Sequence, residues 1–199
     1  KTFDAELLDH AESLDLFAGI TAGYEHLPFE DITARGIVVT NASGVHVPSI
    51  AEQVLGNLLV FARRLDEGWR RQQEPHWEHY QANELKDSTV TVVGLGDIGK
   101  GIVARLDPFD VDTIGVRYSP EKDSPTDEVV GFDGPEFEAA LAQTDFLVLA
   151  CPLTETTEGL IDDAAFMTLA PDAVLVNVAR GGVVDTDALL NVLRRNKLD

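Results

Sequence analysis

Apolar positions along the chain follow two different periods, and this pattern predicts an α/β protein. Short apolar runs bounded by Gly or Pro are typical of buried strands, whereas apolar residues three or four positions apart are typical of amphipathic helices. Strands are predicted at 14–19, 36–40, 89–93, 112–117, 128–132, 145–150 and 172–178. Helices are predicted at 48–65, 97–106, 134–142, near 161–169 and from 185 onward. Because helices that join strands cover both faces of a sheet, we expect a mostly parallel sheet.

The predicted helix at 48–65 separates two blocks of the chain. Its apolar residues Ile50, Val54, Leu58 and Phe61 follow a helical period, and Pro48 stands near its start. We therefore expect two domains, 1–47 and 48–199. The first block is too short for a domain, and the chain stops within the helical pattern "ALLNVLRRNKLD". We expect the chain to be a fragment of a longer protein.

The stretch "TVTVVGLGDIGKGIVARL" has the order strand, glycine turn, helix. Gly94, Gly96 and Gly99 fit the pattern G-x-G-x-x-G. The first glycine allows a tight turn, the second lets the backbone approach a pyrophosphate, and the third lets the helix pack on the strand. The N-terminus of the helix adds unpaired N–H groups and a positive dipole end. The stretch predicts a dinucleotide-binding site; the alternative is a tight turn that binds nothing.

The end of the next predicted strand indicates which dinucleotide would bind. An NAD site places an acidic residue there, about 20 positions after the glycines, to bind the ribose 2′-OH. In this chain the strand ends in Arg117, followed by Tyr118 and Ser119. A guanidinium fits a 2′-phosphate, with the Ser119 hydroxyl as a second donor. The sequence favours NADP with NAD possible, and the alternative is a solvated surface arginine.

The stretch "VNVARGGVVD" places Arg180 and two glycines directly after a predicted buried strand. Ligands of open parallel sheets bind outside the carboxyl ends of the strands. We therefore expect the glycine turn, Arg117, Cys151, Pro152 and Arg180 at one edge of the sheet. The guanidinium of Arg180 presents a fork of donors that suits a carboxylate, and the two glycines leave room for substrate and cofactor.

The charge of the chain narrows the classes of partner. Asp and Glu total 35 against 15 for Lys and Arg, which gives a net charge of −20. Such a surface repels nucleic acid and anionic membranes, so we exclude both as partners. The acidic residues are scattered along the chain, and self-repulsion of this size destabilises a compact state at low salt. We hypothesise a salt-loving host; the alternative is an acidic interaction surface.

Two further features bear on the compartment. No apolar run is long enough to cross a bilayer, and the acidic N-terminal stretch is unlike a signal peptide. The chain has one cysteine, Cys151, which excludes an internal disulfide and fits a reducing compartment. We expect a cytoplasmic protein.

The motifs taken together resemble one known family. "GVHVPSIAEQVLGNLLVFARRL", "VVGLGDIG", "CPLTETTEGLID" and "VNVARGGVVD" have the spacing found in D-2-hydroxyacid dehydrogenases, and the resemblance runs from "ITAGYEHLPFEDITARGIVVTNASG" to the end. It implies two Rossmann-like domains with a cleft between them, and a homodimer built largely from the cofactor domains. Residues 1–47 would be part of a flavodoxin-like substrate-binding domain. Residues 48–199 would be a C-terminally truncated dinucleotide-binding domain.

The resemblance also implies an activity, the reduction of small 2-ketoacids to D-2-hydroxyacids by hydride transfer from NAD(P)H. Arg180 corresponds to the catalytic arginine that binds the substrate carboxylate and polarises the keto group. Ala22 and Gly23, in "TAGYEH", correspond to a loop whose backbone N–H groups hold the same carboxylate. The implied cofactor contacts are Ile50, Gly94, Leu95, Gly96, Asp97, Ile98, Gly99, Arg117, Tyr118, Ser119, Cys151, Pro152, Thr157 and Val178.

Catalysis in this family also needs a histidine as general acid/base and a glutamate that orients it, both located after the arginine motif. The histidines of this chain are His10, His26, His46, His76 and His79, and none matches. We assign no catalytic histidine and no metal site, and we expect both catalytic residues to lie outside this chain. The pair in "EPHWEHY" is expected on a surface helix or loop.

Two alternative functions remain open from the sequence. The same family contains non-catalytic corepressors that sense dinucleotides, and a Glu and a Pro-His pair downstream of Arg180 would favour the enzyme over such a sensor. Formate dehydrogenases share the fold, but nothing in the sequence indicates the specially shaped apolar pocket that they need.

Overall fold

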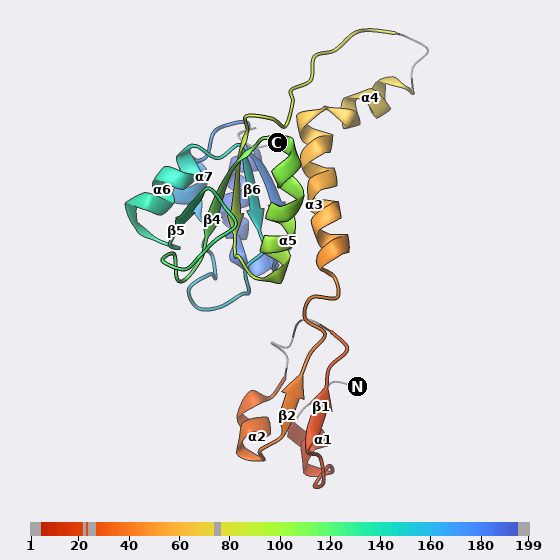
Figure 1. Ribbon diagram of the computed structural model, residues 1–199, viewed down its shortest axis with the longest axis vertical. Coiled ribbons are helices and arrows are strands. Elements are labelled where there is room, and N and C mark those ends of the chain that lie inside the picture. The colour runs from red at the N-terminus through yellow and green to blue at the C-terminus, as the bar shows by residue number, and fades with distance from the viewer. Residues whose placement is uncertain (1–4, 22, 24–26, 74–76, 195–199) are drawn as a thin grey trace. The chain divides into compact units, whose positions relative to one another are not determined.

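A computed structural model describes residues 5–21, 23, 27–73 and 77–194 (Figure 1). The chain divides into two compact units, Lys1–His46 and Val47–Asp199. The larger unit holds the glycine turn and Arg180, and the smaller unit holds Gly23.

In the larger unit, five parallel strands form one sheet in the order β5-β4-β3-β6-β7. The strands are β3 (Thr89–Val93), β4 (Asp112–Val116), β5 (Glu128–Val130), β6 (Phe146–Leu149) and β7 (Val174–Asn177). The chain runs outward from β3 through β4 to β5, then returns to β6 on the other side of β3. In register, Val93 pairs with both Val116 and Leu149, so the strands end at one common edge. The reversal between β3 and β6 creates the crevice in which open α/β sheets bind ligands.

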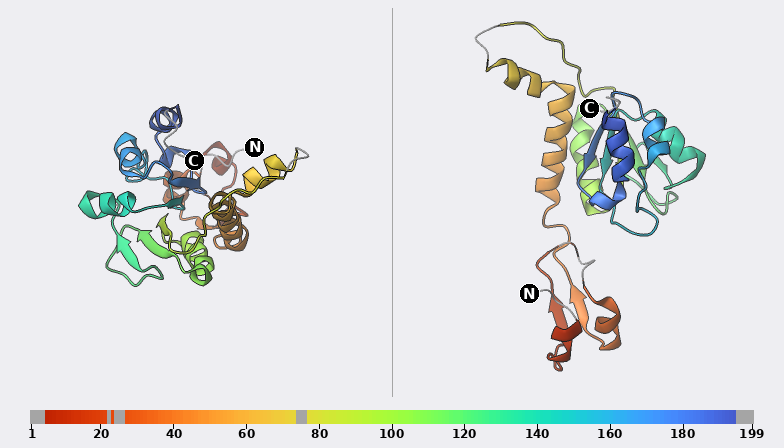
Figure 2. Two further views of the ribbon diagram at one scale, coloured as in Figure 1. Left: turned by 90° about the horizontal axis from the view of Figure 1, so that it is seen from above. Right: turned by 180° about the vertical axis from the view of Figure 1, so that it is seen from behind.

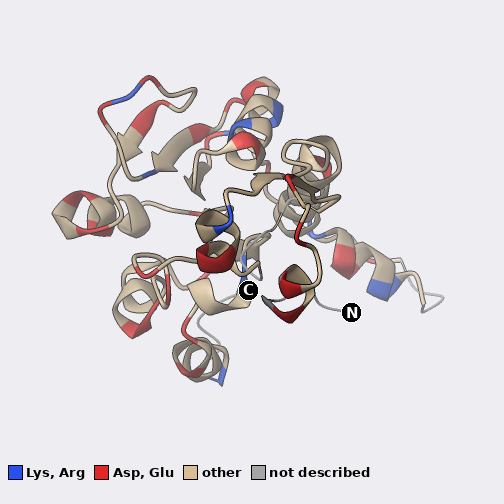
Figure 3. Ribbon diagram, turned by 90° about the horizontal axis from the view of Figure 1, so that it is seen from below, with Lys and Arg blue, Asp and Glu red and all other residues tan. Residues whose placement is uncertain are grey.

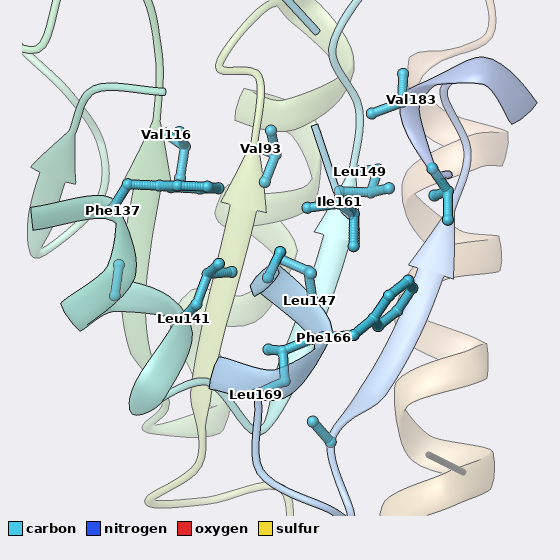
Figure 4. Packing of buried hydrophobic residues seen from close by; sticks show 14 of the residues in the cluster. Val93, Val116, Phe137, Leu141, Leu147, Leu149, Ile161, Phe166, Leu169 and Val183 are labelled. Carbon is cyan, nitrogen blue, oxygen red and sulfur yellow. The ribbon is translucent and has the colours of Figure 1, made fainter. Parts of the chain in front are cut away.

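Helices cover both faces of this sheet (Figure 2). One face carries α3 (Val47–Ala62) and α5 (Asp97–Leu106); the other carries α6 (Gly134–Ala142), α7 (Asp163–Thr168) and α8 (Thr186–Arg194). Successive strand residues point to opposite faces, so Val92 packs toward α3 and α5 while Val93 packs toward α6 and α7. Figure 4 shows the cluster on the α6 and α7 side, with Phe137 of α6 beside Val116 of β4 and Leu141 of α6 beside Leu147 of β6. Burial on both faces explains the continuous apolar runs.

The predicted helix at 48–65 is wrong at its C-terminal end. Helix α3 ends at Ala62, and α4 (Leu65–Arg71) begins after Arg64, whose backbone is left-handed with φ 49° and ψ 45°. A residue in this conformation cannot continue a right-handed helix. The face of α3 that packs against α5 includes Val54 and Leu58, whereas Phe61 is 43% exposed.

In the smaller unit, β1 (Leu16–Ala18) and β2 (Val38–Thr40) form a parallel pair beside α1 (Ala5–Asp9) and α2 (Phe29–Ala34). The prediction that both strands are buried is wrong, because Leu16 is 53% exposed and Val38 is 58% exposed. Alternate strand residues face opposite sides, and only the side of Phe17 and Val39 packs against the apolar cluster around Leu8 and Ile32.

Acidic side chains are spread over the helices and loops of the chain (Figure 3). In the whole chain, 35 acidic residues stand against 15 basic ones. Within the described residues, no helix is long and apolar enough to cross a membrane.

Because unscreened carboxylates repel one another, we predict that the folded chain is stabilised by salt. Raising KCl from 0.1 M to 2 M should increase the thermal midpoint by about 5 °C or more, because the Debye length falls below the spacing of surface charges. Circular dichroism at 222 nm measures the midpoint, with an equal osmolality of sucrose as the control. A midpoint that responds equally to sucrose, or not at all to KCl, would contradict the salt-loving host.

Candidate functional site

At two glycines of the turn between β3 and α5, no side chain would fit. Gly94 has φ +98°, and a Cβ there would lie 2.6 Å from Cα of Cys151. A Cβ on Gly99 would lie 1.9 Å from the carbonyl oxygen of Gly94. The end of β3, the first turn of α5 and the chain after β6 therefore meet in direct backbone contact, as the glycine pattern predicts.

Gly96 has a different role from its two neighbours in the pattern. It is the residue before α5, with φ −75° and ψ −165°, a backbone conformation that any residue can adopt. No atom lies within 4 Å of the place its Cβ would occupy, and no side chain caps the helix at this residue. The space in front of Gly96 is therefore open at the N-terminus of α5, the end of a helix at which phosphate commonly binds.

A cavity of about 650 Å³ lies beside this turn, a size typical of cofactor sites. The predicted cofactor contacts that line it are Gly94, Leu95, Gly96, Arg117, Tyr118, Ser119, Cys151, Pro152 and Thr157. Sequence reasoning missed Lys122, Phe132, Thr154, Glu155 and Thr156, which line it as well. The cavity therefore brings together the loops after β3, β4 and β6.

Other predicted contacts lie outside the lining of this cavity. Asp97, Ile98 and Gly99 form the first turn of α5. Ile50 is half-buried on α3 and packs against the cluster between that helix and the sheet, as does Val178 after β7. The cofactor roles of Ile50 and Val178 stay predictions.

One wall of the cavity is the loop after β4, which carries two cations. The backbone N–H of Arg117 donates to the Val130 carbonyl (3.0 Å), and its Nη1 donates to the carbonyl of Asp123 (3.3 Å). Lys122 lies on the same loop and lines the same cavity. Tyr118 meets Phe132 edge to face, with 6.0 Å between ring centroids. This wall combines positive charge with aromatic surface, which suits an adenosine phosphate.

The far end of this loop is fixed to the sheet by Asp127. Its Oδ2 accepts hydrogen bonds from Oγ1 of Thr113 (2.6 Å) and from the backbone N–H of Thr113 (2.8 Å). The hydroxyl bond and then the backbone bond lower the pKa of the Asp127 carboxyl, which therefore stays ionised at neutral pH. Sequence reasoning missed this anchor.

The opposite wall is the loop after β6. Thr157 is 2% exposed; its Oγ1 donates to the Pro152 carbonyl (2.6 Å) and accepts from the backbone N–H of Thr154 (2.8 Å). Its hydroxyl thus holds the loop in shape. Burial raises the pKa of the Cys151 thiol, so the thiol stays neutral, and Cys151 belongs to the apolar cluster that includes Val93 and Leu149.

Arg180 follows β7 at the same edge of the sheet. Asn177 pairs with Leu149, and the backbone N–H of Val178 donates to the carbonyl of Leu149 (3.0 Å). Arg180 is exposed and extended (φ −137°, ψ 148°), and a 3₁₀ turn, Gly181–Val183, begins directly after it. A Cβ on Gly182 would lie 3.1 Å from Leu153, so this turn packs against the loop after β6.

The smaller unit has a separate cavity at the carboxyl ends of β1 and β2. This cavity of about 180 Å³ is lined by Gly23 among others, and Oγ1 of Thr21 donates to the Gly23 carbonyl (3.0 Å). The predicted partner of Gly23, Ala22, lies outside the described residues, so the carboxylate-binding role of this loop stays a prediction.

Histidines and acidic side chains could also serve as metal ligands or catalytic groups. His26 and His76 lie outside the described residues, while His79 is exposed. In the part of the chain that the structure describes, no three His, Cys, Asp or Glu side chains form a group that would hold a metal ion.

The strand order, the G-x-G-x-x-G turn at the reversal point and the adjoining cavity define a Rossmann-type dinucleotide-binding domain. Residues 55–199 match the family described as "D-isomer specific 2-hydroxyacid dehydrogenase, NAD binding domain". The chain belongs to this family.

Comparison with known proteins shows how broad the family is. A glyoxylate reductase from Thermococcus litoralis is 34% identical over 201 residues, which cover 96% of this chain and 60% of that protein. A D-lactate dehydrogenase from Aquifex aeolicus, solved with NAD and lactic acid, is 25% identical with a TM-score of 0.85, covering 100% of this chain and 61% of that one. An NAD-dependent formate dehydrogenase from Staphylococcus aureus, solved with NAD, is 28% identical with a TM-score of 0.79, covering 98% and 59%. The chain thus spans about 60% of the length of the relatives it matches.

Substitutions at two of the three glycines should affect folding and NADPH binding differently. Gly96→Ala should leave the thermal midpoint unchanged but weaken NADPH binding about tenfold or more, because its methyl group would occupy the space facing the helix N-terminus. Gly94→Ala should lower the free energy of unfolding by roughly 2–4 kcal/mol, because its methyl group would overlap Cys151.

Gly56→Ala on α3, where nothing lies within 4 Å, is the matched control; it should leave NADPH binding unchanged and raise the thermal midpoint slightly, because alanine favours a helix interior over glycine. Fluorescence titration of NADPH and thermal denaturation make the two measurements. Unchanged NADPH affinity in Gly96→Ala would show that the phosphates do not bind at this turn.

Proposed function

We propose that the complete protein reduces small 2-ketoacids to D-2-hydroxyacids with NAD(P)H, and that Arg180 holds the substrate carboxylate. The observation that carries the proposal is the position of Arg180 at the same sheet edge as the glycine turn, directly before a 3₁₀ turn that packs against Leu153 of the loop after β6. The names of relatives such as glyoxylate reductase and D-lactate dehydrogenase support the substrate class.

The chemistry divides between the cofactor and this chain. When bound, the nicotinamide would supply a hydride to C2 of the ketoacid, and the resulting alkoxide would take its proton from the general-acid histidine that the family resemblance places outside this chain. The guanidinium of Arg180 donates to the carboxylate and polarises the adjacent keto oxygen, a charge-assisted contact worth roughly 1.5–3 kcal/mol. From the family resemblance, the backbone N–H groups of Ala22 and Gly23 are proposed as further donors to the substrate carboxylate.

The proposal places the pyrophosphate at Gly96 and the adenosine between the loops after β4 and β6. Arg117, Ser119 and Lys122 then bind the 2′-phosphate of NADP, because two cations and a hydroxyl line that wall of the cavity. NAD binds the same site without this contact. We therefore propose NADP as the preferred cofactor.

A homodimer formed through the larger unit belongs to the same proposal. Helix α4 and the segment after residue 76 are joined by the ion pair of Arg71 with Glu78 (3.1 Å), and Arg71 also pairs with Glu67 within α4. They present Trp69, 61% exposed, and Trp77, 88% exposed. Exposed aromatic surface of this extent supports burial against a second copy.

Cofactor preference tests the role of the two cations. Replacing Arg117 and Lys122 together with Ala should weaken NADPH binding about 30-fold or more, the equivalent of one to two charge-assisted bonds. NADH affinity should change about threefold or less. Lys86→Ala, which removes one cation that lies near Asp110 at the other end of the sheet, is the control. Equal losses for the two dinucleotides would contradict the 2′-phosphate site.

Substrate reduction tests Arg180 directly. In high salt, Arg180→Ala should lower kcat/KM for glyoxylate, hydroxypyruvate and pyruvate about 100-fold or more, because a bidentate contact made with the substrate is lost. The kcat/KM of Arg180→Lys should lie between those of the unaltered protein and Arg180→Ala, since lysine keeps the positive charge but lacks the two parallel N–H donors of the guanidinium. NADPH affinity should not change.

Arg194→Ala, an exposed arginine on α8, is the matched control. Wild-type turnover by Arg180→Ala would refute the role of Arg180. Tight NADPH binding without turnover of any 2-ketoacid by the unaltered complete protein would favour a dinucleotide sensor.

A further inference from the structure

Asn177, the last residue of β7, folds its side chain over the residues that follow it. Its Oδ1 accepts a hydrogen bond from the backbone N–H of Ala179 (2.9 Å), and its Nδ2 donates to the backbone carbonyl of Arg180 (3.0 Å). One carboxamide thus supplies an acceptor and a donor to two successive residues. An ionised carboxylate at this position could accept from the Ala179 N–H but has no proton to donate to the Arg180 carbonyl. The hydroxyl of serine or threonine is on a shorter side chain and cannot reach both groups.

These two bonds connect the last residue of β7 to Ala179 and Arg180, the residues directly before the 3₁₀ turn. The strand contributes its bond from the N–H of Val178 to the Leu149 carbonyl (3.0 Å). The turn contributes its bond from the N–H of Val183 to the Arg180 carbonyl (3.2 Å). The Arg180 carbonyl therefore accepts from both Val183 and Asn177, which holds the extended backbone of Arg180 from each side.

The guanidinium is hydrogen-bonded to a residue that Asn177 also holds. Nη1 of Arg180 donates to the carbonyl of Ala179 (3.0 Å), and Asn177 holds the N–H of Ala179. The residues after Arg180, Gly181 and Gly182, have no side chains that could contact the guanidinium, so the restraint on that side comes from the hydrogen bonds of the 3₁₀ turn. A side chain that must meet a carboxylate with both prongs of its fork tolerates little displacement.

We propose that Asn177 is a positioning residue, which sets the backbone of Ala179 and Arg180 so that the guanidinium is presented to the substrate carboxylate. The proposal rests on the proposed role of Arg180. Asn177 is exposed and at the end of an edge strand, so its two bonds act on the arginine loop more than on the apolar core.

A double-mutant cycle in the complete protein tests this coupling, with Asn177→Ala, Arg180→Ala and the double variant assayed on glyoxylate with NADPH. Asn177→Ala alone should lower kcat/KM about tenfold, mainly by raising KM, the equivalent of two neutral hydrogen bonds. In the Arg180→Ala background the same change should alter kcat/KM about twofold or less, because the group it positions is gone. Asn191→Ala, an exposed asparagine on α8, is the matched control.

Thermal midpoints and NADPH affinities of all variants separate positioning from a general loss of structure. Both should stay close to those of the unaltered protein in Asn177→Ala. Equal losses from Asn177→Ala in the two backgrounds would overturn the positioning role while leaving the proposed function standing. Full activity in Arg180→Ala would instead refute the proposed function itself.

Discussion

The structure of the larger unit depends on how closely three backbone segments approach at Gly94. A Cβ at that position would overlap the backbone of Cys151, and a Cβ at Gly99 would overlap the carbonyl of Gly94. Only glycine satisfies both contacts, so β3 can lead into α5 directly beneath the end of β6. This close approach leaves open space in front of Gly96 and sets the loops after β4 and β6 as the two walls of one cavity.

The parts of the fold that follow local rules could be predicted from the sequence. Strands buried on both faces, such as β3 and β6, give unbroken apolar runs, and α5 gives a clear helical period. The sequence also identified Gly94, Gly96 and Arg117 as neighbours, because parallel strands end at one edge. The roles of Arg180, Gly23 and the nucleotide preference stay predictions, since they concern what is bound.

Other features could not be predicted, because they depend on contacts distant in sequence or on single backbone angles. The end of α3 is set by the left-handed backbone conformation of Arg64, which cannot be predicted because arginine has no preference for this conformation. The short helices α1, α2 and α4 carry too few turns for a period to show. Lys122 reaches the cavity through the path of a loop anchored by Asp127, and Phe132 reaches it from the chain after β5.

Hydrogen–deuterium exchange of the complete protein with and without NADPH, in high salt, tests the central claim that the cavity beside the glycine turn binds the dinucleotide. The account predicts slower amide exchange in three segments, 94–99, 117–122 and 151–157, and unchanged exchange at the amino ends of β3 and β4, on the opposite edge of the sheet. Saturating NADPH that leaves these three segments unprotected, or that protects a different surface, would contradict the account.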